Sequence, residues 1–172
     1  FRRVLFRSET PETIQYGTNC IVHISGSILG PRSTTSLIQP IIGIRSQGLN
    51  SGLTIMISGS CQPGPGYVAP AGATGWLATF NNNARNCTLI VNGDITGSGT
   101  ANGYTIVTTN SGSVITVNGN ILQSGSVTTA HTIYSTAGYT AVTINGNIET
   151  RGSSSAVSFI GNAPNYITIR GN

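Results

Sequence analysis

A seven-residue motif recurs six times along this 172-residue chain. It has an aliphatic residue four and two positions before a glycine and another two positions after it, as in Ile115-Thr-Val117-Asn-Gly119-Asn-Ile121. The spacings between the motif glycines are 33, 34, 26, 27 and 25 residues, and the glycines are Gly26, Gly59, Gly93, Gly119, Gly146 and Gly171. Repetition at a period of about 20–50 residues is typical of solenoids and related arrays, in which neighbouring repeats bury one continuous core.

The alternation within each motif is that of a β-strand with one buried face, because successive side chains of a strand point to opposite sides. A second, shorter β-prone segment follows several motifs after a loop, and the examples are residues 104–109, 131–134 and 156–160. No helical period is present, and glycine or proline interrupts every candidate window. The sequence therefore predicts an all-β chain.

Stacking of equivalent repeats explains this pattern most simply. We predict a single-domain parallel β-helix, or β-solenoid, of about five to six coils over residues 19–172. Two internal ladders are expected, one formed by Val22, Ile55, Leu89, Ile115, Val142 and Ile167, the other by Ile24, Ile57, Val91, Val117, Ile144 and Ile169. The motif glycines would lie at a bend or a close backbone approach. The alternative is a β-sandwich or jelly roll, but its antiparallel strands rarely need one motif repeated in one polarity.

Charge is scarce in this chain. Charged residues make up 7% of it, against roughly 25% in an average soluble domain, and lysine is absent. This composition argues against coiled coils and helical bundles, which need Ala, Glu, Lys and Leu. No apolar run approaches the roughly 20 residues of a transmembrane helix, so we expect no membrane span.

The first eight residues differ from the rest of the sequence. Back-translated, Phe1–Ser8 resembles the end of a common sequencing-library adapter, and we interpret residues 1–8 as an artefact of a metagenomic assembly. The alternative is a genuine basic strand that binds nucleic acid. From Glu9 onward, five arginines and four acids give a net charge of +1, so we expect no nucleic-acid partner. Residues 9–18 would form an N-terminal strand or linker before the repeat domain.

Two carboxylates lie in the repeat body, Asp94 and Glu149. Many parallel β-helices cleave acidic polysaccharides with paired carboxylates, so this pair is a candidate, with Arg151 nearby for an acidic sugar. The two Cα atoms are expected about 11–12 Å apart, because they are separated by two coils along the axis and by two residues along the strand. An inverting glycosidase needs carboxyl groups roughly 6.5–9.5 Å apart, which long side chains could reach. The simpler interpretation is two unrelated surface carboxylates, and we predict no catalytic residue.

The histidines and cysteines show no metal-ligand spacing. His23 and His131 are far apart and are expected on strand faces. The cysteines, Cys20, Cys61 and Cys87, are expected to be small buried side chains, with Cys61 replacing an internal isoleucine. Cys20 and Cys87 would lie two coils apart, with Leu53 between them, which is too far for a disulfide. We expect no metal, no cofactor and no disulfide framework.

Uncharged polar residues dominate the predicted outer face. Polar side chains flank successive motif glycines, with Asn92, Asn118 and Asn145 before them and Asp94, Asn120 and Asn147 after them. Stacked asparagines can hydrogen-bond amide to amide along the axis. Asn86-Cys-Thr88 is the one N-glycosylation sequon in the sequence. Two insertions, at 30–36 and 61–72, lengthen the first two repeats and are either a binding side or tolerated loops.

The aliphatic–Asn-Gly-Asn-Ile motif resembles the coils of secreted β-helix adhesins of the filamentous-haemagglutinin type. It is also similar to β-helical segments of phage tail fibres and spikes. The resemblance covers roughly residues 19–172, concerns architecture, and transfers no active-site residues. It implies an elongated protein of the extracellular space or of a cell or virion surface, which presents loops or glycans to a partner.

We therefore predict a non-enzymatic structural subunit or segment of an extracellular fibre or adhesin. Its expected partners are further copies of itself, joined head to tail near Arg170 and the first coil, and surface glycans. The first alternative is a β-helical phage tail-fibre or spike protein that binds or degrades polysaccharide. The second is a pilin-like β-sandwich that donates residues 9–18 as a strand to its neighbour.

Overall fold

The computed structural model describes residues 13–14, 21–29, 42–44, 52–62, 80–82, 85–97, 105–109, 111–127, 131–152 and 155–172. For residues 13–14, 42–44, 80–82, 124–127 and 151–152 it describes the backbone alone. The described part of the chain contains β-strands and no helix, and therefore no helix that could span a membrane. The prediction of an all-β chain is confirmed for these residues.

The strands form three sheets, which we name A, B and C. Sheet A contains β1 (Thr13–Ile14), β4 (Ile42–Ile44), β7 (Phe80–Asn82), β10 (Ile106–Thr108), β13 (Ile133–Ser135) and β16 (Val157–Phe159). Sheet B contains β2 (Ile21–Ile24), β5 (Thr54–Ile57), β8 (Thr88–Val91), β11 (Val114–Val117), β14 (Ala141–Ile144) and β17 (Tyr166–Ile169). Sheet C contains β3 (Ile28–Leu29), β6 (Cys61–Gln62), β9 (Ile95–Gly97), β12 (Ile121–Val127) and β15 (Ile148–Gly152).

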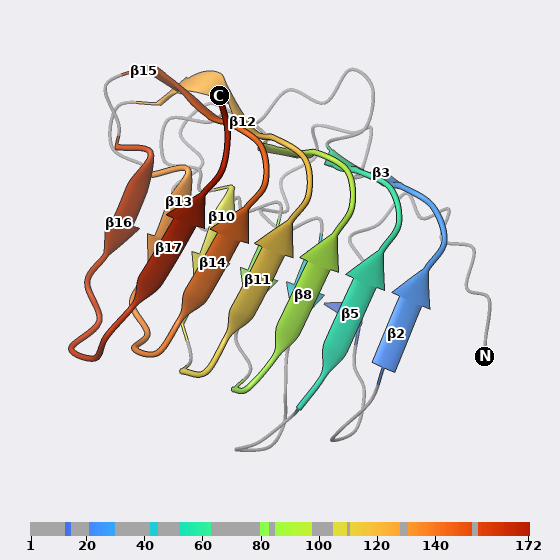
Figure 1. Cartoon of the computed structure of the whole chain (residues 1–172), viewed down its shortest axis with the longest axis horizontal. Helices are drawn as coiled ribbons and strands as arrows, with labels where there is room; N and C mark the ends of the chain where they lie inside the picture. The colour runs from blue at the N-terminus through green and yellow to red at the C-terminus, as the bar shows by residue number, and fades with distance from the viewer. Residues whose placement is uncertain are drawn as a thin grey trace.

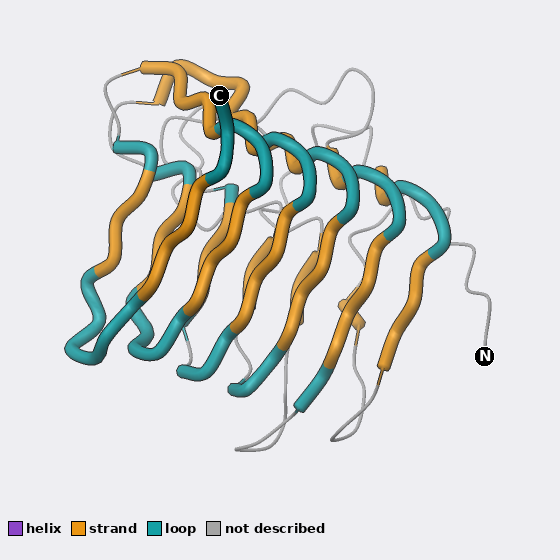
Figure 2. Tube along the Cα trace, viewed as in Figure 1, coloured by secondary structure: helices purple, strands orange, loops and turns teal. Residues whose placement is uncertain are grey.

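The chain visits the three sheets in the same order, A then B then C, throughout its length. We call one such passage a coil, so that β1–β3 form the first coil and β16–β17 belong to the last. Each strand pairs with the equivalent strand of the next coil, and the strands of sheet B lie side by side in chain order (Figure 1). Short bends connect sheet B to sheet C in every coil that has a strand in sheet C (Figure 2). All described pairs are parallel, whereas a β-sandwich or jelly roll is built from antiparallel pairs.

The register of sheet B confirms the pairing of both predicted aliphatic ladders, but their last members, Ile167 and Ile169, are 36% and 50% exposed and not buried as expected. Ile115 pairs with Leu89 on one side and Val142 on the other, and Val117 pairs with Val91 and Ile144. In the middle coils these side chains are 0–2% exposed. A third ladder follows the bend in sheet C, where Ile28, Cys61, Ile95, Ile121 and Ile148 are in register. Burial of each aliphatic side chain contributes about 1.5–3 kcal/mol, so the ladders are the main source of stability.

The motif glycines are required by close stacking of the bends. A Cβ atom added to Gly119 would lie 2.6 Å from the carbonyl carbon of Gly93 in the preceding coil. The same addition at Gly93 would lie 2.8 Å from the carbonyl carbon of Gly59. Backbone atoms cannot yield as a flexible side chain does, so the close approach expected at these glycines is confirmed.

A left-handed backbone conformation recurs two residues before several strands of sheet B. Gly52, Asn86, Gly112 and Tyr139 have φ values of 51°, 53°, 81° and 56°, in the left-handed region. Glycine adopts this region without cost and asparagine tolerates it, whereas tyrosine is strained there. The equivalent residue of the last coil is Pro164, whose ring fixes φ near −65°.

Sheet A differs from sheet B, whose strands bury one face as expected for the motif. Strand β10 is buried on both sides, since Ile106, Val107 and Thr108 are all no more than 1% exposed. The three short segments predicted after the motifs do form strands of this sheet, β10, β13 and β16, each three residues long. Strands β4 and β7 add to them, and β1 lies within residues 9–18. The two insertions lie outside the described residues, apart from Cys61–Gln62 in β6.

Hydroxyl groups fill part of the interior beside sheet A. The Thr108 hydroxyl donates a hydrogen bond to Ser135 Oγ at 2.7 Å, and Ser135 Oγ lies 3.2 Å from Thr140 Oγ1. All three residues are at most 1% exposed. Mutual hydrogen bonding removes most of the cost of burying them. The core is therefore aliphatic between sheets B and C and partly polar at the end of β10 and β13.

Candidate functional site

Two rows of polar side chains run from coil to coil along the bend between sheets B and C, and they are the most regular described feature of the surface. The residues directly after the first five motif glycines form what we call the bend row, and they are Ser27, Ser60, Asp94, Asn120 and Asn147. The residues directly before three of these glycines form the amide row, and they are Asn92, Asn118 and Asn145.

Four members of the bend row each accept a hydrogen bond from the backbone of the next coil. Ser27 Oγ accepts from Ser60 N at 3.0 Å, and Ser60 Oγ accepts from Asp94 N at 3.0 Å. Asp94 Oδ1 accepts from Asn120 N at 2.7 Å, and Asn120 Oδ1 accepts from Asn147 N at 2.9 Å. Serine, aspartate and asparagine all carry an oxygen that can reach this donor, which explains why these three residue types share the position.

The amide row consists of asparagine side chains bonded to each other. Asn118 donates through Nδ2 to Asn92 Oδ1 at 2.8 Å, and Asn145 donates through Nδ2 to Asn118 Oδ1 at 2.7 Å. The predicted stacking of asparagines is confirmed here. Because the three side chains are exposed to solvent, the row joins the coils and also presents amide groups on the outside.

The structure does not bring the two candidate carboxylates together. The register of sheet C places Asp94 level with Asn120 and Asn147, so Glu149 lies two coils and two residues away, as the sequence predicts. That offset corresponds to about 12 Å between Cα atoms. The carboxylate of Asp94 instead contacts Asn120, from which it accepts the backbone bond and a second bond from Nδ2 at 3.2 Å. Arg151 lies in β15, where the backbone alone is described.

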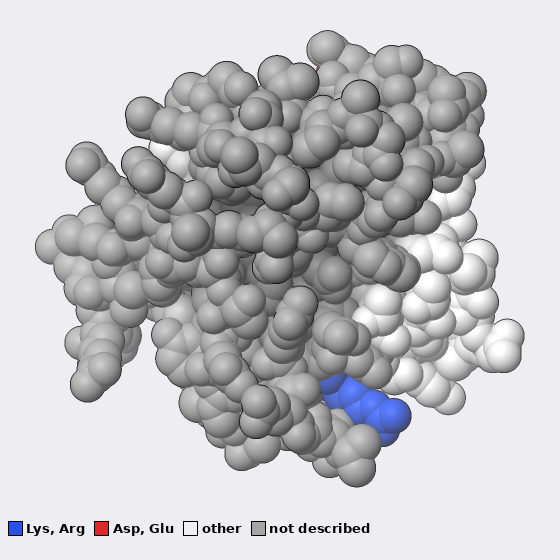
Figure 3. Space-filling view, turned by 180° about the vertical axis from the view of Figure 1, so that it is seen from behind, with Lys and Arg blue, Asp and Glu red and all other residues white. Residues whose placement is uncertain are grey.

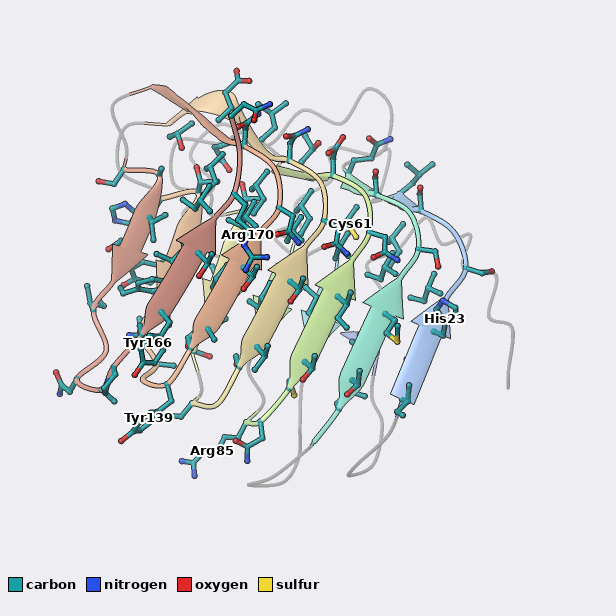
Figure 4. All side chains as sticks on the ribbon, viewed as in Figure 1. His23, Cys61, Arg85, Tyr139, Tyr166 and Arg170 are labelled. Carbon is teal, nitrogen blue, oxygen red and sulfur yellow. The ribbon has the colours of Figure 1, made fainter. Side chains whose placement is uncertain are left out.

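The two histidines belong to different ends of the molecule. His23 is on the exposed face of β2, where its Nε2 forms a hydrogen bond of 3.0 Å with Ser58 Oγ (Figure 4). His131 lies two residues before β13, and its ring stacks on Tyr134 with centroids 5.7 Å apart. Among the described residues, no group of three His, Cys, Asp or Glu side chains is arranged to hold a metal ion.

Cys61 and Cys87 are buried thiols, and neither forms a disulfide among the described residues. Cys61 stands between Ile28 and Ile95 in the ladder of sheet C, as expected for a residue that replaces isoleucine. Burial raises the pKa of the Cys61 thiol from 9.0 to about 12, which suppresses the reactive thiolate. Cys87 donates a weak hydrogen bond to the carbonyl oxygen of Arg85 at 3.5 Å. Cys20 lies outside the described residues.

The sequon residue Asn86 is exposed, with its left-handed φ just before β8. Its backbone N–H donates to Ser111 O at 3.1 Å, and its side-chain oxygen lies against Gly112 of the next coil. Glycosylation of Asn86 remains a prediction. Seen from behind, the described surface in view is mostly uncharged, although most of that view belongs to residues outside the described ranges (Figure 3).

The sequence analysis did not predict the cluster of hydroxyl groups of Thr108, Ser135 and Thr140. Serine and threonine are also common in turns, so their presence alone does not mark a buried position. A register argument from Ile106 and Ile133 could have found it, since the residues two positions further on must also point inward.

No known family model, curated protein or solved structure matches this chain.

Proposed function

We propose that this chain is a parallel β-helix, or β-solenoid, and that it is a non-enzymatic structural segment of an extracellular fibre or adhesin. The observation that carries the proposal is the continuity of the rows from coil to coil. The amide row, the bend row and three aliphatic ladders all repeat with the same register. Such an arrangement extends in one direction and is suited to a stiff rod.

The polar chemistry of the bends supports a structural role. Four of the five bend-row side chains, including the carboxylate of Asp94, accept a hydrogen bond from the backbone of the following coil. A general acid or base needs a proton-transfer partner in a substrate, whereas Asp94 Oδ1 already accepts two hydrogen bonds from Asn120. The proposal therefore assigns Asp94 to cohesion between coils and assigns no catalytic role to Glu149.

Composition supports an extracellular or surface location. The scarcity of charge and the abundance of Thr, Ser and Asn suit a protein that presents a neutral, hydroxyl- and amide-rich surface. Surface glycans are a fitting class of partner, since exposed amide and hydroxyl rows offer both donors and acceptors.

Immunogold electron microscopy tests the location. Antibodies against the chain should decorate extended structures on cells or particles from the sample that carries its gene. Labelling confined to the cell interior would contradict the proposal. A reducing-sugar assay against acidic and neutral polysaccharides tests the absence of catalysis, and turnover abolished by Glu149→Gln would favour the polysaccharide-degrading alternative instead.

A further inference from the structure

We propose that Asn145-Gly146 is a site of spontaneous deamidation, at which the folded chain converts the Asn145 amide into a carboxylate beside Arg170. The inference is independent of the proposed function, because it concerns a covalent change within one bend. Three observations carry it: the dipeptide that the bends repeat, the hydrogen bonds of the amide row, and the residue level with Asn145 in the next coil.

The bends repeat a dipeptide that is chemically labile. Asn92, Asn118 and Asn145 are each followed by a motif glycine, and all three side chains are exposed to solvent. Asparagine is a thermolabile residue, and glycine after it leaves the attacking nitrogen unhindered because glycine has no side chain. The glycine nitrogen loses its proton to a base and attacks Cγ of the asparagine. A new C–N bond forms, the Cγ–Nδ2 bond breaks, and the amide nitrogen leaves as ammonia.

Water then opens the cyclic imide that this attack produces. Opening at one carbonyl gives aspartate, and opening at the other gives isoaspartate, whose main chain runs through the former side chain. Either product carries a new negative charge and has lost the Nδ2 donor. Water and a base are the only other reactants, and an exposed bend has access to both.

Hydrogen bonds protect the three asparagines unequally, because they must break before Cγ and the glycine nitrogen can meet. Asn118 is held on both sides, since it donates to Asn92 at 2.8 Å and accepts from Asn145 at 2.7 Å. Asn92 accepts one of these bonds, and the nitrogen of the glycine after it donates to Gly59 O at 3.1 Å. Asn145 donates one bond, and within the described ranges the nitrogen of the glycine after it donates none. One bond therefore protects Asn145, whereas two protect each of the others.

The amide row is followed by an arginine in the last coil. Ile144 pairs with Ile169, and Arg170 N donates to Ile144 O at 2.8 Å, just as Asn145 N donates to Val117 O one coil earlier. Arg170 is therefore level with Asn145, at the bend beside β14 (Figure 4). A nearby guanidinium stabilises both the anionic nitrogen that attacks and the carboxylate that results. The other two asparagines have a neutral amide at this position in the next coil.

Peptide mapping by mass spectrometry tests the order of reactivity. Chymotrypsin separates Asn118 from Asn145, because Tyr134 and Tyr139 lie between them. In the folded chain at mildly alkaline pH, Asn145 should show the mass change of an NH2-to-OH exchange at least about fivefold faster than Asn118 or Asn92, the factor for one hydrogen bond fewer. In urea the three sites should react at equal rates, because each asparagine lies between an aliphatic residue and glycine. The unfolded chain is thus the internal control.

Variants separate the hydrogen-bond effect from the charge effect. Asn118→Ala removes the side-chain bond of Asn145 and should accelerate its reaction about fivefold. Arg170→Gln should slow the reaction of Asn145 about twofold, the size expected for an exposed charge. The matched control is Arg85→Gln, which removes the same charge where the strands of sheet B begin and not where they end, and should leave the rate unchanged (Figure 4).

Equal rates at the three asparagines of the folded chain would mean that the reaction needs unfolding, and would overturn the inference. An Asn145 that reacts only after urea is added would overturn it as well. Neither result would change the immunogold location on which the proposed function depends.

Discussion

Asn118 and Asn92 are 26 residues apart in the chain, yet their side-chain amides are joined by a hydrogen bond of 2.8 Å. Asn118 in turn accepts from Asn145 at 2.7 Å, so one amide bridges three coils. This contact is possible only if successive strands of sheet B are parallel and in register, because a slip of one residue would turn the side chains to the other face. The amide row is thus both a product of the register and a means of fixing it.

Replacing Asn118 with alanine should lower the free energy of unfolding by about 1–2 kcal/mol, because two hydrogen bonds are lost. Asn145→Ala removes one of these bonds and should cost about half as much. Urea unfolding followed by circular dichroism measures both values. Equal stability of Asn118→Ala and the wild type would show that the row contributes nothing to cohesion.

Replacing Val117 with aspartate should unfold the chain. Val117 is 0% exposed within its ladder, and an unpaired charge there costs several kcal/mol. The control is Thr116→Asp, which places the same carboxylate on the outer face of the same strand and should remain folded. Thermal unfolding distinguishes the two, and similar melting temperatures would contradict the assigned faces of β11.

Tyr139→Gly should stabilise the chain by up to about 1 kcal/mol, since it relieves a left-handed φ of 56°. Tyr166 is a matched control, because the exposed fractions of the two tyrosines are 63% and 64%. Tyr166→Gly should destabilise the chain by about 0.5–1 kcal/mol, because glycine weakens a strand. The two melting temperatures should therefore shift in opposite directions, and shifts of the same sign would refute the strain at Tyr139.

Cys61 should make stability depend on pH in the alkaline range. Burial raises the pKa of its thiol from 9.0 to about 12, so the folded chain retains a proton that the unfolded chain loses. The contribution of the protonated Cys61 thiol to the free energy of unfolding is fully present below pH 9. It falls by about 1.4 kcal/mol per pH unit between pH 9 and 12. Cys61→Val should show a shallower decline in urea unfolding over this range. Identical curves would mean that Cys61 is not buried.

The same burial predicts slow chemical labelling. With Cys20 and Cys87 replaced by serine, Cys61 should react with iodoacetamide at pH 8 about a thousandfold more slowly in the folded chain than in urea, from the change in ionisation alone. A labelling rate that urea leaves unchanged would contradict this prediction.

The ladders of sheets B and C could be predicted from the sequence because their inward residues are almost all aliphatic. Aliphatic residues recur at fixed positions around the motif glycines, such as Val117 and Ile121 around Gly119 and Ile144 before Gly146. This pattern specifies both the buried face of the strand and the repeat length. Sheet A could be predicted only in part. The strand Phe80–Asn82 carries asparagines where its neighbours carry Val107 and Thr108, so no recurring side-chain type marks it.

Two features of the bends and turns could not be predicted from the sequence, and each has a physical reason. The left-handed position is occupied by Gly52, Asn86, Gly112 and Tyr139, and tyrosine gives no sequence signal for such a conformation. The bend row was visible as asparagines, but its continuation through Ser60 and Ser27 depends on the oxygen that these side chains share and not on their type.

The most direct test of the stacked register is the formation of engineered disulfides between neighbouring coils. Thr116, Thr143 and Thr168 are in register on the outer face of sheet B, in three successive coils. In a background with the native cysteines replaced, Thr116→Cys with Thr143→Cys should oxidise readily, because adjacent strands lie about 4.8 Å apart. The pair Thr116→Cys with Thr168→Cys spans two coils, about 9.6 Å, and should stay reduced. Rapid oxidation of the first pair alone is the predicted result, and oxidation of the second pair alone, or of neither, would contradict the stacked parallel coils.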